Sequence, residues 1–242
     1  MKLQSKNKFD LIKLQIKAVE LLRLVKEEYS YQDLMKITGI PITVLNRYIK
    51  GHILPSPDRA AFILSTIEKK FDLSKYIKEK IIFDKGGFLD HTRIIGDTLL
   101  LRHVSNYIVK TLAGKRISKV LTVAVDGIPL AAHIANAFDV PFVYAKKEKE
   151  VGVSSFIEES YTLQGFGMQV SLYLPKGLIE KKDSVLITDD VIRSGEQIRA
   201  LINMVKKIGA EIAAIFILIT IGERWKKEVE EYPVYSLVEL SE

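Results

Sequence analysis

The segment Ser184–Gln197, with the sequence SVLITDDVIRSGEQ, constrains the fold of this chain more than any other. A short apolar run leads into two adjacent acids, Asp189 and Asp190, then into a polar turn and a helical pattern. When a strand, a turn and a helix follow in this order, the backbone N–H groups of the turn and of the first helical turn are unpaired. These N–H groups and the helix dipole attract a phosphate. Gly195 permits a close backbone approach, and the acids suit ribose hydroxyls or Mg²⁺. The alternative is an ordinary connection whose acids cap a helix.

Apolar runs and helical patterns alternate from about residue 85 onward. We expect strands at Val120–Val125, Pro141–Ala145, Met168–Leu174, Val185–Thr188 and Ile212–Ile219. Continuous apolar runs of this kind are typical of strands buried on both faces. The pattern predicts an α/β fold with an open, mostly parallel sheet, in which ligands bind at the carboxyl ends of the strands.

Three other segments lie near such strand ends. Asp126 and Gly127 follow the first strand, where a helix N-terminus would receive an anion; alternatively, Asp126 simply caps that helix. Lys146 and Lys147 follow the second strand, and we expect one of them to neutralise a pyrophosphate; alternatively, they belong to an exposed run of mixed charge. The long polar segment Val151–Gly167 is expected to be a loop, and a loop of this length is usually either functional or disordered.

Composition excludes several classes of protein. The chain has no cysteine, which excludes disulfides, thiolate metal sites and a cysteine nucleophile, and fits a reducing compartment. Its four histidines show no metal-ligand spacing among themselves. The N-terminus lacks the pattern of a signal peptide, and the longest apolar run, Ile212–Ile221, is too short to span a bilayer. We therefore expect a cytoplasmic protein without a membrane partner.

Charge divides the chain into two parts, and we expect domains at residues 1–80 and 85–242. Residues 1–80 carry 16 Lys and Arg against 9 Asp and Glu, whereas residues 81–242 carry 20 against 21. A basic segment joined to a nearly neutral one is typical of a nucleic-acid-binding module attached to another domain.

The basic part also has a helical pattern that suits DNA. A helix from Leu11 to about Glu28, capped by Asp10, precedes a helix that begins near Tyr31 and ends at Gly39, and a third helix spans about Pro41 to Ile49. Two short helices joined by a glycine turn indicate a helix-turn-helix module. Thr43, Asn46 and Arg47 suit base edges; Lys50, Gln32 and Lys36 suit phosphates. The alternative is a helical hairpin used only for dimerisation.

The segment Val185–Gly195 resembles the motif that binds 5-phosphoribosyl 1-pyrophosphate (PRPP) in type I phosphoribosyltransferases. The resemblance implies that the all-α helix-turn-helix domain is followed by a domain of that fold, with PRPP, Mg²⁺ and a homodimer. Where catalytic members commonly have small or hydroxylated residues after the glycine, this chain has Glu196 and Gln197. A carboxylate repels a phosphate.

The whole chain resembles archaeal orotate phosphoribosyltransferase-like DNA-binding regulators and bacterial purine repressors. It is thus expected to be a transcriptional regulator that senses PRPP or a purine or pyrimidine nucleotide. The alternative is an active phosphoribosyltransferase with an appended helix-turn-helix domain. No residue is assigned a catalytic or metal-ligating role. The residues expected to contact PRPP or nucleotide are Asp126, Gly127, Lys146, Lys147, Asp189, Asp190, Arg193, Ser194, Gly195, Glu196 and Gln197.

Overall fold

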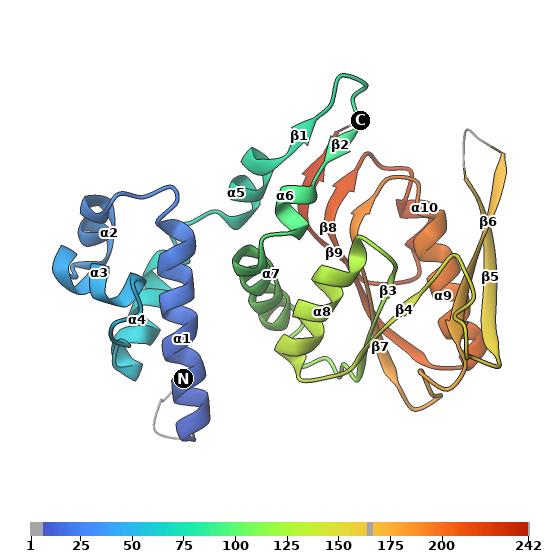
Figure 1. Ribbon diagram of the computed structural model, residues 1–242, viewed down its shortest axis with the longest axis horizontal. Coiled ribbons are helices and arrows are strands. Elements are labelled where there is room, and N and C mark those ends of the chain that lie inside the picture. Colours follow the sequence, from blue (N-terminus) through green and yellow to red (C-terminus); the bar gives the residue numbers. More distant parts are fainter. Residues whose placement is uncertain (1–6, 164–166, 242) are drawn as a thin grey trace. The chain divides into compact units, whose positions relative to one another are not determined.

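The computed structural model describes residues 7–163 and 167–241. The chain forms two compact units, the first ending at Leu73 and the second beginning at Ser74 (Figure 1). Within the described ranges, no helix is both long and apolar enough to cross a membrane.

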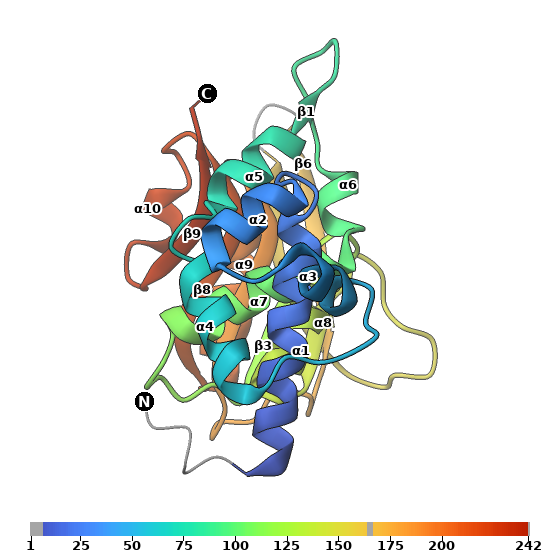
Figure 2. The ribbon, with the colours of Figure 1, turned by 90° about the vertical axis from the view of Figure 1, so that its left-hand side faces the viewer.

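The first unit consists of helices packed on one apolar core. They are α1 (Lys8–Val25), α2 (Tyr31–Thr38), α3 (Ile42–Ile49) and α4 (Pro57–Ile67). α1 lies beside α4 in both views (Figures 1 and 2). Leu22, Leu34 and Leu45 have no exposed surface and bring α1, α2 and α3 together. The cap of α1 is Asn7 rather than the predicted Asp10, because the Asn7 carboxamide accepts a hydrogen bond from the Asp10 amide at 2.9 Å.

The two short helices predicted in this region, α2 and α3, are present, and Gly39 lies in the turn between them. Ser30 and Asp33 form a reciprocal capping box at the start of α2. Gly39 ends α2 with a φ of 68°, a left-handed conformation that favours glycine.

The second unit opens with α5 (Leu73–Lys80) and a short antiparallel hairpin of β1 (Ile82–Phe83) and β2 (Leu89–Asp90). α6 (Thr92–Ile95) and α7 (Thr98–Thr111) follow. Asp97 caps α7 by accepting hydrogen bonds from two backbone amides of its first turn. The hairpin thus stands between the helical unit and the rest of the second unit in the sequence.

A five-stranded, wholly parallel sheet forms the core of the second unit. Its order is β4–β3–β7–β8–β9, with β3 (Lys119–Val123), β4 (Phe142–Ala145), β7 (Ser184–Ile192), β8 (Glu211–Ile221) and β9 (Val234–Leu240). α7 and α8 (Gly127–Phe138) cover one face, and α9 (Glu196–Ile208) and α10 (Lys226–Val229) lie on the other (Figure 1). The predicted α/β fold is confirmed. β9, which the sequence interpretation left unassigned, forms one edge of the sheet.

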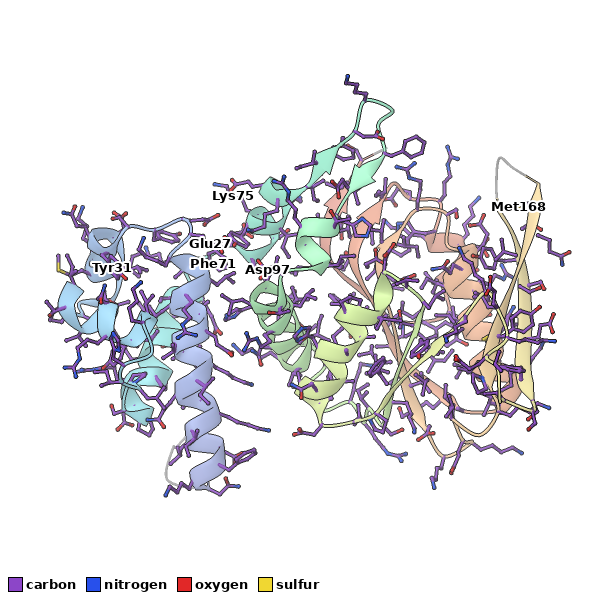
Figure 3. All side chains as sticks on the ribbon, in the orientation of Figure 1. Glu27, Tyr31, Phe71, Lys75, Asp97 and Met168 are labelled. Carbon is purple, nitrogen blue, oxygen red and sulfur yellow. The ribbon has the colours of Figure 1, made fainter. Side chains whose placement is uncertain are left out.

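Two expectations about the middle of this unit were wrong. Met168–Leu174 was assigned to the parallel sheet, but β6 (Met168–Pro175) pairs antiparallel with β5 (Phe156–Leu163) in a separate two-stranded ribbon. β5 also occupies half of the segment expected to be a loop, whose residues 164–166 lie outside the described ranges. This ribbon is buried only toward the C-terminal end of β6: Leu172 and Leu174 are fully buried, whereas Met168, at the start of β6, is 56% exposed (Figure 3).

Candidate functional site

The two acids predicted from the sequence lie at the carboxyl-terminal end of β7, in the centre of the parallel sheet. Asp189 is 2% exposed and Asp190 is 6% exposed. The side-chain amide of Gln197 donates a hydrogen bond to Asp189 Oδ2 at 2.8 Å, and the Asp190 amide donates to Asp189 Oδ1 at 3.2 Å. Asp189 is therefore held by protein groups on both of its oxygens.

The two acids differ in charge. Burial, followed by the nearby Asp190 carboxylate, raises the pKa of Asp189 well above 3.8. Burial also acts to raise the pKa of Asp190, but its hydrogen bond with His91 and the other favourable contacts outweigh burial, and this pKa is lowered. The negative charge of the pair therefore concentrates on Asp190.

His91 is the site residue that the sequence interpretation missed. It follows β2 and is half-buried, and its Nε2 atom forms an ion pair with Asp190 Oδ2. The hydrogen bond to Asp190 raises the pKa of His91, although burial opposes this. A single histidine in a polar segment carries no motif, so only the folded chain reveals this contact.

A pocket of about 560 Å³ opens at the acid pair. Its lining includes seven of the eleven residues predicted for PRPP or nucleotide: Asp126, Gly127, Lys146, Lys147, Asp189, Asp190 and Gln197. They come from the carboxyl ends of β3, β4 and β7 and from the start of α9, which are far apart in the sequence. Arg193 lines a separate pocket of about 320 Å³, together with Arg224 and Phe83.

The two predicted lysines have different surroundings. The Lys146 ammonium forms an ion pair with Glu150, and this hydrogen bond raises the pKa of Lys146. The alternative expectation, that Lys146 belongs to an exposed run of mixed charge, therefore holds in part, because its partner Glu150 is in the same run. Lys147 is exposed on the same pocket, next to Glu148.

Gly127 is required by close packing behind the pocket. A Cβ atom at this position would lie 2.1 Å from Thr122 Oγ1 and 2.7 Å from Asp189 Oδ1. Asp126, at the cap position of α8, makes no side-chain capping bond to the described residues and is exposed on the pocket instead. The alternative that Asp126 serves as a helix cap is therefore wrong.

The turn before α9 contains a carboxylate as well as backbone amides. Gly195 has a φ of 95°, and a Cβ atom there would lie 2.9 Å from the Cβ of Glu228 and 3.1 Å from the Cα of Trp225. The Ser194 hydroxyl donates a hydrogen bond to the carboxylate of Glu196. Ser194, which was expected to hold a phosphate, thus binds its own neighbour in this structure.

Three potential metal ligands meet beside the acid pair. A nitrogen of His91 and carboxylate oxygens of Asp126 and Asp190 all lie within 4.8 Å of one another. These residues come from the hairpin segment, the β3–α8 turn and the end of β7. No residue had been assigned as a metal ligand from the sequence, because the three are distant along the chain.

In the helical unit, five of the six residues predicted to contact DNA are exposed: Gln32, Lys36, Thr43, Arg47 and Lys50. Asn46 is half-buried, and its side-chain amide donates a hydrogen bond to the hydroxyl of Tyr31 at 3.1 Å. Tyr31 stands at the start of α2 (Figure 3). The predicted base contact of Asn46 would therefore compete with a bond that joins α2 to α3.

Relatives of this chain include both an enzyme and a regulator. The hypoxanthine/guanine phosphoribosyltransferase of Methanotorris igneus is 40% identical over 146 residues, covering 58% of this chain and 75% of that protein. The purine biosynthesis transcriptional repressor PurR of Bacillus subtilis is 31% identical over 156 residues, covering 64% of this chain and 54% of PurR. This chain thus spans less than two thirds of the length of that regulator.

Structural and family comparisons agree on the second unit. The adenine phosphoribosyltransferase from Rhodothermus marinus superimposes with a TM-score of 0.62 at 27% identity, covering 69% of this chain and 98% of that one. A family model described as the phosphoribosyl transferase domain matches residues 95–241, more than half of the chain. The chain therefore belongs to the phosphoribosyl transferase domain family.

Proposed function

We propose that this protein is a DNA-binding transcriptional regulator whose phosphoribosyl transferase domain senses PRPP or a purine or pyrimidine nucleotide. The observation that carries the proposal is that one chain joins this domain to a basic helical unit, in which Thr43 and Arg47 on α3 and Lys50 directly after it are exposed. The chain is also similar to PurR proteins that are named as transcriptional regulators of purine biosynthesis, and this similarity supports the same assignment.

In this proposal the ligand lies in the pocket of about 560 Å³. Asp190 accepts hydrogen bonds from ribose hydroxyls, and the buried Asp189 fixes the position of Asp190 from behind. Lys147 and the amide groups at the start of α8 face a pyrophosphate, while the amides of residues 193–197 face a 5-phosphate. Carboxylate oxygens of Asp126 and Asp190 suit Mg²⁺, which prefers oxygen ligands and substrate phosphates. When bound, Mg²⁺ neutralises pyrophosphate charge.

DNA recognition in this proposal uses α3 as the helix that enters the major groove. Arg47 and Thr43 read base edges, and Lys50, Gln32 and Lys36 contact phosphates. Two copies of the unit on a two-fold homodimer would read a palindromic operator. A ligand changes DNA affinity only if it binds two arrangements of the dimer with different affinity.

An active phosphoribosyltransferase is the second candidate, because the Methanotorris relative is named as such an enzyme and is 40% identical. Catalysis in such a site depends mainly on positioning and charge stabilisation, which a preserved pocket supplies. Glu196 argues for the regulator, because its carboxylate stands in the turn where the 5-phosphate would bind.

The deciding experiment selects genomic DNA fragments with the purified full chain, with and without PRPP and Mg²⁺. Selective enrichment that changes with PRPP is expected. Arg47→Ala should weaken selective binding by about 1–3 kcal/mol, the usual value of one good base contact, and leave PRPP binding intact. Lys69→Ala is the matched control, because it removes one exposed positive charge outside α2 and α3. No enrichment, together with nucleobase-dependent release of pyrophosphate from PRPP, would establish the enzyme instead.

Asp190→Asn tests the ligand half of the proposal. It should weaken PRPP binding while ligand-free DNA binding stays unchanged, because the acid lies in the second unit. Isothermal titration with PRPP and Mg²⁺ measures the first effect, and a DNA mobility shift measures the second. Unchanged PRPP affinity would show that the acid pair does not contact the ligand.

A further inference from the structure

We propose that His91, Asp126 and Asp190 form a divalent transition-metal site that the chain builds by itself, before PRPP or DNA binds. The site shares the pocket of the proposed function. It differs from a magnesium ion carried in by PRPP, because one of its ligands is an imidazole from outside the residues that the family model matches, 95–241.

The geometry brings three donors together from three separate elements. The donor atoms all lie within 4.8 Å of one another, and His91 Nε2 already contacts Asp190 Oδ2. Bonds of about 2.0–2.2 Å place the ligand atoms of a tetrahedral or octahedral ion roughly 3–3.5 Å apart. The exposed side chain of Asp126 has room to move in by the remaining distance, whereas Asp190 is fixed in the core.

The chemistry of the donor set selects a class of ion. A metal ion would displace the proton between His91 and Asp190 to solvent, and the two carboxylates and the neutral imidazole would then carry a net charge of −2, which matches a divalent cation. Imidazole suits Zn²⁺, Fe²⁺ and Cu²⁺, while oxygen donors suit Mn²⁺ and Mg²⁺. The mixed set therefore favours a first-row transition ion such as Mn²⁺ or Zn²⁺ over Mg²⁺, which prefers oxygen ligands and retains water.

The surroundings leave one side of the site open. Asp126 and Asp190 both line the pocket of about 560 Å³, so water or a ligand oxygen would complete the coordination. Asp189 supports Asp190 from behind: it accepts the Asp190 amide hydrogen bond at 3.2 Å and is itself held by Gln197 at 2.8 Å. Such outer contacts orient metal ligands in known sites.

The test measures Mn²⁺ binding to the metal-stripped full chain without PRPP or DNA, from the loss of the electron paramagnetic resonance signal of free Mn²⁺. One Mn²⁺ per chain is expected. His91→Ala should weaken binding by at least about tenfold, since even outer-contact changes cost that much in metal sites. Mg²⁺ affinity, measured by competition, should fall less. His52→Ala is the matched control, because His52 is exposed in the first unit.

Circular dichroism, and a second variant, His91→Gln, distinguish loss of the ligand from misfolding. Equal Mn²⁺ affinity in wild type and a folded His91→Ala would overturn the inference and leave His91 as an ion-pair partner of Asp190. PRPP binding in Mg²⁺ is titrated separately. If the protein binds PRPP but does not bind Mn²⁺ in the absence of PRPP, the metal site is refuted and the proposed function stands. If it binds Mn²⁺ but not PRPP, the proposed ligand is refuted and the metal site stands.

Discussion

Replacing Gly127 with alanine tests how the pocket is built. The added Cβ atom would lie 2.1 Å from Thr122 Oγ1 and 2.7 Å from Asp189 Oδ1, and both of these residues are buried. Neither distance is tolerable for nonbonded atoms, so the start of α8 must move away from β3 and β7, or the two side chains must turn. A displaced Asp189 would also strain its 2.8 Å hydrogen bond from Gln197.

The expected loss follows from two opposing effects. Overpacking a core usually costs about 1–3 kcal/mol. A glycine-to-alanine change in a compatible backbone ordinarily stabilises by about 0.4–1 kcal/mol, and Gly127 lacks the positive φ that would cancel this gain. We therefore expect a net destabilisation of about 1–2 kcal/mol and weaker PRPP binding.

Urea unfolding followed by fluorescence of Trp225 measures the stability, because it is the only tryptophan and is 7% exposed in the second unit. Gly177→Ala is the control: its Cβ would meet nothing within 4 Å, so only its φ of 87° opposes the change, and PRPP binding should be unaffected. Adding Thr122→Ala to Gly127→Ala should restore part of the stability. A Gly127→Ala protein as stable as wild type, with unchanged PRPP affinity, would refute this account of the packing.

Three smaller changes probe other parts of the molecule. Tyr161→Phe removes the 3.2 Å hydrogen bond to Gln197 and should cost about 0.5–1.5 kcal/mol in urea unfolding; no change would mean that the bond does not form. Burial acts to raise the pKa of Asp183, but hydrogen bonds from a backbone amide and a serine hydroxyl outweigh burial, and this pKa is lowered. The ionised Asp183 therefore stabilises the folded protein above pH 3.8, and this contribution should be lost as the pH falls from 3.8 through the folded-state pKa. Asp183→Asn should flatten this acid limb. Leu45→Ala in α3 should destabilise the helical unit by about 2–5 kcal/mol, seen as earlier loss of helical circular dichroism.

The parallel sheet could be predicted because its central strands contain continuous apolar runs. The runs at 185–188 and 213–219 are buried on both faces, and no polar alternation obscures them. β9 (Val234–Leu240) was missed because an edge strand is only partly buried, so its sequence lacks that continuous pattern. β6 was recognised as a strand from its alternation of apolar and polar residues. That alternation does not identify the neighbouring strand, because pairing with β5 depends on the tertiary structure.

The candidate site was predictable where it depends on a local motif. The acid pair, Gly127 and the lysines after β4 follow strands that the sequence already indicated, and parallel strands bring their carboxyl ends to one edge. His91 has no such signal. Its place beside Asp190 depends on how the β1–β2 hairpin folds onto the sheet, which no local pattern encodes.

The two residues that depart from the family pattern already have hydrogen-bond partners inside this domain. Gln197 was expected near a 5-phosphate, yet its side-chain amide donates to Asp189 at 2.8 Å. Burial raises the pKa of Asp189, and the bond from Gln197 is one of the contacts that act against this rise. Because Gln197 supplies that bond, Asp189 is stable inside the sheet without a ligand, and only Asp190 is left to meet one. Glu196 meanwhile holds Ser194. A phosphate that binds in this turn must therefore break that contact and overcome the charge of Glu196.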